Sequence, residues 1–170
     1  MITDFLLDHA ALVPAALALV ALVCVAVGYA ALRLDRPGVP LLPALAVIAA
    51  VGVLVLTMAP TGRDPSTRGC TVQFAWPGAG SVELLANVAL LLPVAVFAAL
   101  ATRRPWAVLV VGSGASAAIE AVQALVPAIG RACDTNDWFM NTLGAAVGAL
   151  FAIVIIAVEA PRRLRGRARP

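Results

Sequence analysis

Five long apolar runs dominate the chain, and short polar or turn-rich segments separate them. The runs are Ala10–Leu32, Leu41–Ala59, Leu84–Ala101, Trp106–Val126 and Trp138–Val158. Each is close to the ~20 residues with which a helix crosses the hydrocarbon core of a bilayer. The pattern predicts an all-α membrane protein that forms a single bundle of about five transmembrane helices.

Composition supports this prediction, because 62% of the 170 residues are hydrophobic and 12% are charged. Alanine, valine, leucine and glycine are frequent, which favours close helix packing through small side chains. We expect three parts: an N-terminal transmembrane helix and turn over residues 1–40, a four-helix membrane core over residues 41–158, and a basic cytoplasmic tail over residues 159–170.

Arginine is the only basic residue type apart from one histidine, and its distribution predicts the orientation of the bundle. If the runs cross in turn, nine arginines fall on one side and three, Arg63, Arg68 and Arg131, fall on the other. Because basic residues favour the cytoplasmic side, we predict an N-terminus outside and a C-terminus in the cytoplasm. The basic tail then acts as a topology signal and contacts anionic membrane lipids, and we expect no nucleic-acid partner.

Polar residues within the apolar runs gather at the predicted outer end. Two runs and the bend between them hold six of these residues: Glu120, Gln123, Arg131, Asp134, Asp137 and Asn141. From the helical rise, Glu120 lies about 9 Å below the outer end of its run, and Asn87 and Asn141 lie about 5 Å below theirs. Three predicted helices therefore bring polar groups to a similar depth near the outer leaflet.

The spacing of the later polar residues predicts where the last helix starts. Asp134, Asp137 and Asn141 follow an i, i+3, i+7 pattern. This places Asp134 at the N-cap, with Asp137 closing the first turn. Gly144 and Gly148 continue the same face as a GxxxG pair, which lets a neighbouring backbone approach closely.

Glu120 is the most costly of these residues to place in a membrane. A charge at mid-helix costs about 2.5–3.5 kcal/mol on insertion scales, so Glu120 should face the bundle interior or a wet cavity. We expect Arg131 to pair with Glu120 or Asp134. One interpretation is that the polar groups only join helices through hydrogen bonds. The other, favoured by their number, is a binding or catalytic pocket open to the outer leaflet.

The three cysteines fall in two environments. Cys24 lies inside the first run and is expected to be a small buried apolar side chain. Cys70 and Cys133 both lie in predicted outer loops, where disulfides persist, and we propose that they pair. The bridge would tie the long second loop, which is either a lid or an ordinary surface loop, over the polar bend; the chain-entropy model gives it about 4 kcal/mol.

Three motifs, in this order and spacing, resemble the VanZ-like family of bacterial membrane proteins. They are NVALLLP at Asn87–Pro93, E-x-x-Q at Glu120–Gln123, and R-x-x-D-x-x-D-x-x-x-N-x-x-G from Arg131 to Gly144. The resemblance covers roughly Leu41 to Val158. It implies a multi-pass protein of the bacterial plasma membrane, whose namesake is an accessory determinant of resistance to the glycopeptide teicoplanin. The family's polar signature gives these candidate ligand-binding residues: Asn87, Glu120, Gln123, Arg131, Asp134, Asp137 and Asn141.

The function that we favour, mainly through the resemblance, is a binding or shielding protein. Its outer pocket would engage a lipid-linked envelope precursor or a lipophilic glycopeptide. In this hypothesis Arg131 contacts an anionic head group, while Glu120, Asp134 and Asp137 contact an amine or a peptide N–H.

The second hypothesis is a membrane enzyme that acts on a lipid phosphate or a cell-wall precursor, with Glu120, Asp134 and Asp137 as candidate catalytic residues. The one histidine, His9, lies near the N-terminus, so acid–base chemistry would fall to these carboxylates. We expect no bound cofactor, with a divalent cation at the carboxylates as the alternative. Transport with Glu120 as a proton carrier is the weakest hypothesis, because alternating access would require a homo-oligomer here.

Overall fold

The computed structural model describes residues 10–34, 40–60, 70–78 and 81–167. Its elements, in chain order, are η1 (Ala10–Leu12), α2 (Val13–Leu34), α3 (Leu41–Met58), β1 (Cys70–Thr71), α4 (Val82–Thr102), α5 (Pro105–Leu125), η2 (Pro127–Ile129), β2 (Cys133–Asp134) and α6 (Thr135–Arg167). Five of these helices are long and apolar enough to cross a membrane, which confirms the predicted all-α bundle. His9, Arg63 and Arg68 lie outside the described residues.

Local sequence sets the ends of the helices. α4 ends at Thr102, where Arg103 takes a left-handed conformation (φ 57°), and Pro105 starts α5. Proline suits the first position of a helix, because its missing N–H would have no helical partner there. α6 starts at Thr135, three residues before the predicted Trp138, and its backbone stays helical to Arg167. Much of the segment predicted as a tail is therefore an extension of the last helix.

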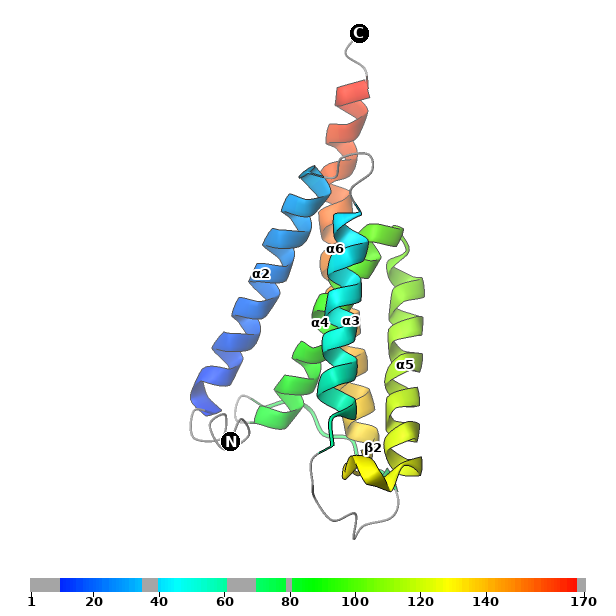
Figure 1. Ribbon diagram of the computed structural model, residues 1–170. Coiled ribbons are helices and arrows are strands. Elements are labelled where there is room, and N and C mark those ends of the chain that lie inside the picture. Colours follow the sequence, from blue (N-terminus) through cyan, green and yellow to red (C-terminus); the bar gives the residue numbers. More distant parts are fainter. Residues whose placement is uncertain (1–9, 35–39, 61–69, 79–80, 168–170) are drawn as a thin grey trace.

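α4 is the central helix, because each of the other four long helices packs against it. It contacts α6 most extensively, and α5 packs mainly against α6. In Figure 1 α3 stands in front of α4 and α5 stands to the right of both, and α3 and α5 make little direct contact with each other. The last residues of α3 and α5 and the first residues of α4 and α6 lie at one end of the bundle (Figure 1), the end that the arginine distribution predicts to be outside.

Two glycines let α6 approach α4 closely. A Cβ atom at Gly144 would overlap the backbone carbonyl of Val88, and one at Gly148 would lie 2.7 Å from the carbonyl oxygen of Leu92. Lipid tails are as apolar as leucine, so helices in a bilayer associate largely through close packing of this kind. The close approach predicted from the GxxxG pair is confirmed, and α4 is the helix that approaches.

Apolar side chains fill the interior of the bundle and also cover its outside. Val96 and Leu100 of α4 are fully buried, whereas Leu22, Ile48 and Val110 on three other helices are 65%, 68% and 72% exposed. Exposed leucine and valine in such numbers suit a surface that faces lipid rather than water.

An ion pair joins the first and last long helices at the other end of the bundle. The Nη2 atom of Arg33 in α2 lies 3.0 Å from Oε1 of Glu159 in α6, whose side chain is only 7% exposed. Arg33 Nε donates to the same oxygen, and its guanidinium stacks over the ring of Tyr29. Arg33 and Glu159 are 126 residues apart, and the sequence alone does not indicate that they pair.

Candidate functional site

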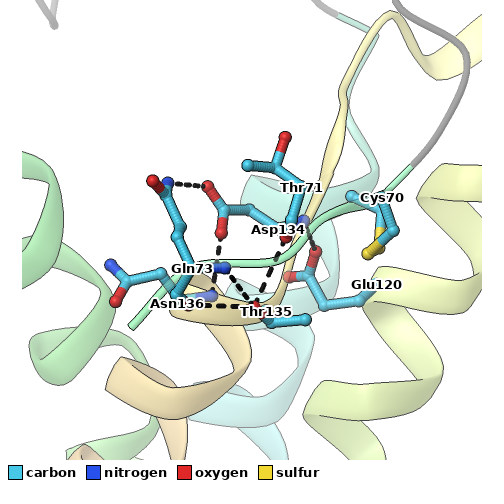
Figure 2. The surroundings of a disulfide bond; sticks show 8 residues. Cys70, Thr71, Gln73, Glu120, Asp134, Thr135 and Asn136 are labelled. Carbon is cyan, nitrogen blue, oxygen red and sulfur yellow. Dashed lines mark hydrogen bonds between the residues drawn. A yellow bond between two sulfur atoms is a disulfide. The ribbon is translucent and has the colours of Figure 1, made fainter. Parts of the chain in front are cut away.

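Residues 70–76, which we call the strap, cross the start of α6 at the predicted outer end. Cys70 and Cys133 are joined by a disulfide, the pair that we proposed from their positions in the two outer loops. β1 and β2 run parallel to each other, with Cys70 opposite Cys133 and Thr71 opposite Asp134. Figure 2 shows Thr71 beside Asp134. The connection between α3 and α4 and the connection between α5 and α6 therefore meet at the end of the bundle where α3 and α5 end.

The strap is also bound to the first turn of α6 by hydrogen bonds. Gln73 N donates to Thr135 Oγ1 (2.9 Å), and Ala75 N donates to Asn136 Oδ1 (2.8 Å). The side-chain amide of Gln73 donates to Asp134 Oδ2 at 2.6 Å (Figure 2). The strap is therefore fixed to the start of α6, beside the polar cluster formed by Glu120, Asp134, Asp137 and Asn141, and is not a free surface loop.

Aromatic rings extend this anchoring beyond the polar contacts. Phe74 and Trp76 both meet the ring of Phe139 edge-on, with centroids 5.9 Å and 5.7 Å apart. Phe74 and Trp76 remain 62% and 79% exposed, which suits side chains at a membrane–water interface.

Asp134 and Glu120 connect the start of α6 to α5. Asp134 Oδ1 accepts a hydrogen bond from Asn136 N (2.8 Å), so Asp134 acts as the N-cap that its position predicts. The backbone N–H of Asp134 donates to Glu120 Oε2 at 2.9 Å (Figure 2). In a capping box, this N–H would instead donate to the side chain of Asp137, three residues later in α6. Glu120 is only 6% exposed, as expected for a carboxyl group inside the bundle.

Asp137 and Asn141 point to two different helices. Asp137 Oδ1 accepts a hydrogen bond from Asn87 Nδ2 of α4, and Asn141 Nδ2 donates to Ser116 Oγ of α5 at 3.0 Å. Asn141 and Ser116 are 2% and 0% exposed. The other end of the Asn141 amide, Oδ1, is buried and has no hydrogen-bond partner among the described residues.

Gln123 and Arg131 turn away from the carboxylates towards the end of α3. Gln123 Nε2 donates to the carbonyl of Thr57 (3.0 Å), and Arg131 Nη2 donates to the carbonyl of Leu56 (2.8 Å). The expected ion pair of Arg131 with Glu120 or Asp134 does not form among the described residues. The last carbonyls of a helix have no partner within it, and an exposed arginine in the adjacent bend can reach one.

Sequence reasoning missed the serines that face this cluster from α5. Ser113 Oγ lies 3.0 Å from Thr142 Oγ1, and Trp138 Nε1 donates to Ser113 at 3.2 Å. The small residues of the run Gly112–Ser116 indicate close packing and draw attention away from these two serines. The signal was its pair of serines at i and i+3, which lie on the same face as Glu120 one turn further on.

A sequence model of the VanZ/LLP1 family matches residues 16–156. The chain belongs to the VanZ/LLP1 family. Together with its five membrane-length helices, this makes it a multi-pass membrane protein. The match begins inside α2, so it includes the first helix, which the resemblance over Leu41–Val158 left out. No curated protein and no solved structure matches the chain.

In this VanZ/LLP1 protein, the residues that the motifs single out divide into two groups. Gln123, Arg131 and Asp134 use their polar atoms to join helix ends and the strap. Glu120 and Asn141 are buried, and together with Asp137 they bring carboxylate and carbonyl oxygens, which are acceptors, to the contacts of α6 with α4 and α5. Such a site suits a ligand that donates hydrogen bonds. The described residues include no group of three or more His, Cys, Asp or Glu that could hold a metal ion.

Proposed function

We propose that this VanZ/LLP1 protein is a binding protein of the bacterial plasma membrane that acts as an accessory factor in resistance to teicoplanin-type glycopeptides. Its ligand is a lipid-linked envelope precursor or the lipophilic drug itself. The binding residues are Glu120, Asp137 and Asn141, with Asn87, Gln123 and Asp134 as their supports.

The observation that carries the proposal is the unpaired carbonyl oxygen of Asn141. A buried acceptor without a partner costs about 1–3 kcal/mol, so residues that serve only to join helices normally satisfy both ends of an amide. The neighbouring carboxylates of Glu120 and Asp137 are also acceptors. An ammonium group or a peptide N–H of a ligand would satisfy this group of oxygens.

Arg131 supports a second contact at the rim of the site. Its guanidinium is exposed and uses one N–H for the carbonyl of Leu56. A guanidinium has five N–H donors, so others remain for a phosphate or carboxylate at the membrane surface. A ligand with an anionic group at the surface and an N–H donor deeper in the bundle would match both the guanidinium of Arg131 and the carboxylates of Glu120 and Asp137.

The test compares cells that express wild type, Glu120→Gln, Arg131→Ala or Thr142→Val. Glutamine keeps an acceptor for the backbone of Asp134 but removes the charge. We expect the Glu120→Gln change to weaken binding of teicoplanin to the purified protein about 10-fold or more and to lower the resistance of the cells, because charged hydrogen bonds contribute about 1.5–3 kcal/mol. Thr142→Val is the control, since among the described residues this hydroxyl bonds to Ser113 of α5 and not to Glu120, Asp137 or Asn141.

A glycopeptide without a lipid chain serves as the control ligand. Equal teicoplanin susceptibility and equal envelope lipids in all four strains would contradict the proposal. The same lipid profile tests the enzyme alternative, which is favoured by the buried carboxyl group of Glu120 and the half-buried one of Asp137 on neighbouring helices, as an acid–base pair. If the protein is an enzyme, Asp137→Asn makes a lipid substrate accumulate, whereas a binding protein leaves the lipids unchanged.

A further inference from the structure

An apolar groove of about 520 Å³ runs between α3 and α5, with α4 as its floor. Its walls are made by residues such as Val53 and Leu54 of α3 and Val111 and Ala115 of α5. Leu54 and Val111 are 53% and 70% exposed, so the groove opens sideways to the surroundings of the bundle. In a membrane protein, that side faces lipid.

Among the described residues, hydrogen bonds from α5 and the α5–α6 bend to the end of α3 close one end of the groove. Gln123 and Arg131 bind the last carbonyls of α3 and so hold the final turns of α3 and α5 together at the predicted outer end. Over the rest of their length the two helices make little direct contact. The groove therefore extends from Ile119, beside the polar cluster, to the start of α5 at the predicted cytoplasmic end.

The open end of the groove carries a positive charge. Arg104 is the charged residue among the described residues that line the groove, and it immediately precedes the first residue of α5. The free N–H groups at a helix start add a partial positive charge at the same place. The groove thus combines an apolar channel with a cationic end at the depth of a membrane interface.

We propose that the groove binds one acyl chain of an anionic phospholipid of the surrounding membrane, with the lipid phosphate at Arg104. From Arg104 to Ile119 the groove is about 22 Å long by the helical rise, enough for one extended acyl chain. The volume lies within the usual range of ligand sites, about 300–1,000 Å³. The positive charge at Arg104 favours a ligand with an anionic head group over a purely apolar helix segment from a second copy.

This inference is separate from the proposed function, because the phosphate would lie at Arg104, at the opposite end of the bundle from Glu120 and Asn141, and the ligand is a phospholipid of the surrounding membrane. The test is native mass spectrometry of the purified protein, released from detergent with phosphatidylglycerol or phosphatidylcholine of the same chains. We expect one phosphatidylglycerol to be retained about five-fold better, since one basic residue near an anionic surface contributes that much. Arg104→Gln should remove this preference, and Arg104→Lys should keep most of it.

Two adjacent valines provide a matched test of the channel. Val110 and Val111 are 72% and 70% exposed on α5, but only Val111 lines the groove. Val111→Phe should reduce retention of the lipid several-fold, and Val110→Phe should not. Ala115→Phe, also in the groove, repeats the test if Val111→Phe is not monodisperse on gel filtration.

Three outcomes overturn the proposal. They are equal retention of the two lipids by wild type, equal retention by the Val110 and Val111 variants, and a dimer that Val111→Phe dissociates while lipid retention stays constant. The last outcome would assign the groove to a second copy of the chain.

Discussion

Asn141 shows how much depends on a single polar atom in this bundle. One end of its amide is bonded to Ser116, and the other end is buried without a partner among the described residues. If Asn141 serves only to join α5 and α6, removing it should destabilise the protein. If it binds a ligand, its unpaired oxygen should lower the free energy of unfolding of the ligand-free protein.

We predict that Asn141→Leu leaves the free energy of unfolding unchanged or raises it by about 1 kcal/mol, and that it abolishes ligand binding. Leucine is similar in size and removes the unpaired acceptor, while the hydroxyl of Ser116 can bond to a carbonyl one turn earlier. Denaturant titration in detergent micelles measures the stability. Thr142→Val is the comparison, with an expected loss of about 0.5–1.5 kcal/mol. A loss of about 1–3 kcal/mol in Asn141→Leu would assign Asn141 to helix joining.

Gly144 allows a sharper test of packing at the same scale. A methyl group at this position would collide with the backbone of Val88, which cannot move aside as a flexible side chain can. We predict that Gly144→Ala destabilises the bundle by about 1–3 kcal/mol, measured by thermal unfolding in micelles. Gly114 has nothing within 4 Å of such a methyl group. Gly114→Ala should therefore be neutral or stabilising, and similar losses at both glycines would refute close packing as the cause.

At the scale of elements, the strap joins the connection before α4 to the start of α6. The disulfide joins cysteines 63 residues apart, and the hydrogen bonds of Gln73 and Ala75 add contacts to α6. The helices between the two cysteines are already constrained by the membrane. The disulfide should therefore contribute less than the ~4 kcal/mol that the chain-entropy model gives for a free loop.

We predict that replacing both Cys70 and Cys133 with serine keeps the helices but loosens the strap. Hydrogen exchange of the strap amides should become faster, with a loss of global stability below about 4 kcal/mol. Cys24→Ser, in α2, is the control and should leave exchange in the strap unchanged. Without reductant, a thiol assay on the unfolded wild-type protein should detect Cys24 alone. Three reactive thiols would show that the bridge does not form.

At the scale of the whole molecule, orientation relates the two ends of the bundle to their surroundings. The disulfide and the polar cluster lie at the end predicted to be outside, where disulfides persist. The groove opening at Arg104 and the ion pair of Arg33 with Glu159 lie at the other end. Two arguments of different kinds, arginine distribution and disulfide position, thus agree on one orientation.

We predict that a C-terminal alkaline phosphatase fusion is inactive, whereas a fluorescent protein at the same position folds and is bright. The reason is that alkaline phosphatase needs an oxidising compartment for its disulfides and the arginine-rich end should stay in the cytoplasm. A phosphatase inserted in the second loop, between α3 and the strap, is the matched control and should be active. The reverse pattern would invert the bundle and place the polar cluster on the cytoplasmic side.

Much of this protein could be predicted from its sequence, because the governing interactions are local. The length of an apolar run predicts a membrane span, and five runs predicted the five membrane-length helices found among the described residues. Asp134 could be identified as an N-cap and Gly144 as a site of close approach from their positions along a single helix. Counting residues also placed Glu120 and Asn141 near the same end of the bundle, and Figure 1 shows that the end of α5 and the start of α6 lie together there.

The tertiary structure alone decided which groups meet, because a partner depends on how each helix is rotated and on which helix stands beside it. Arg131 was expected to pair with a carboxylate, yet the end of α3 lies closer and offers an unpaired carbonyl. Ser116 became the partner of Asn141 because α5 turns that face towards α6. The groove exists because α3 and α5 are joined at one end and separate along the rest of α4. A sequence determines how far a helix runs through a membrane, but only packing determines what its polar side chains find there.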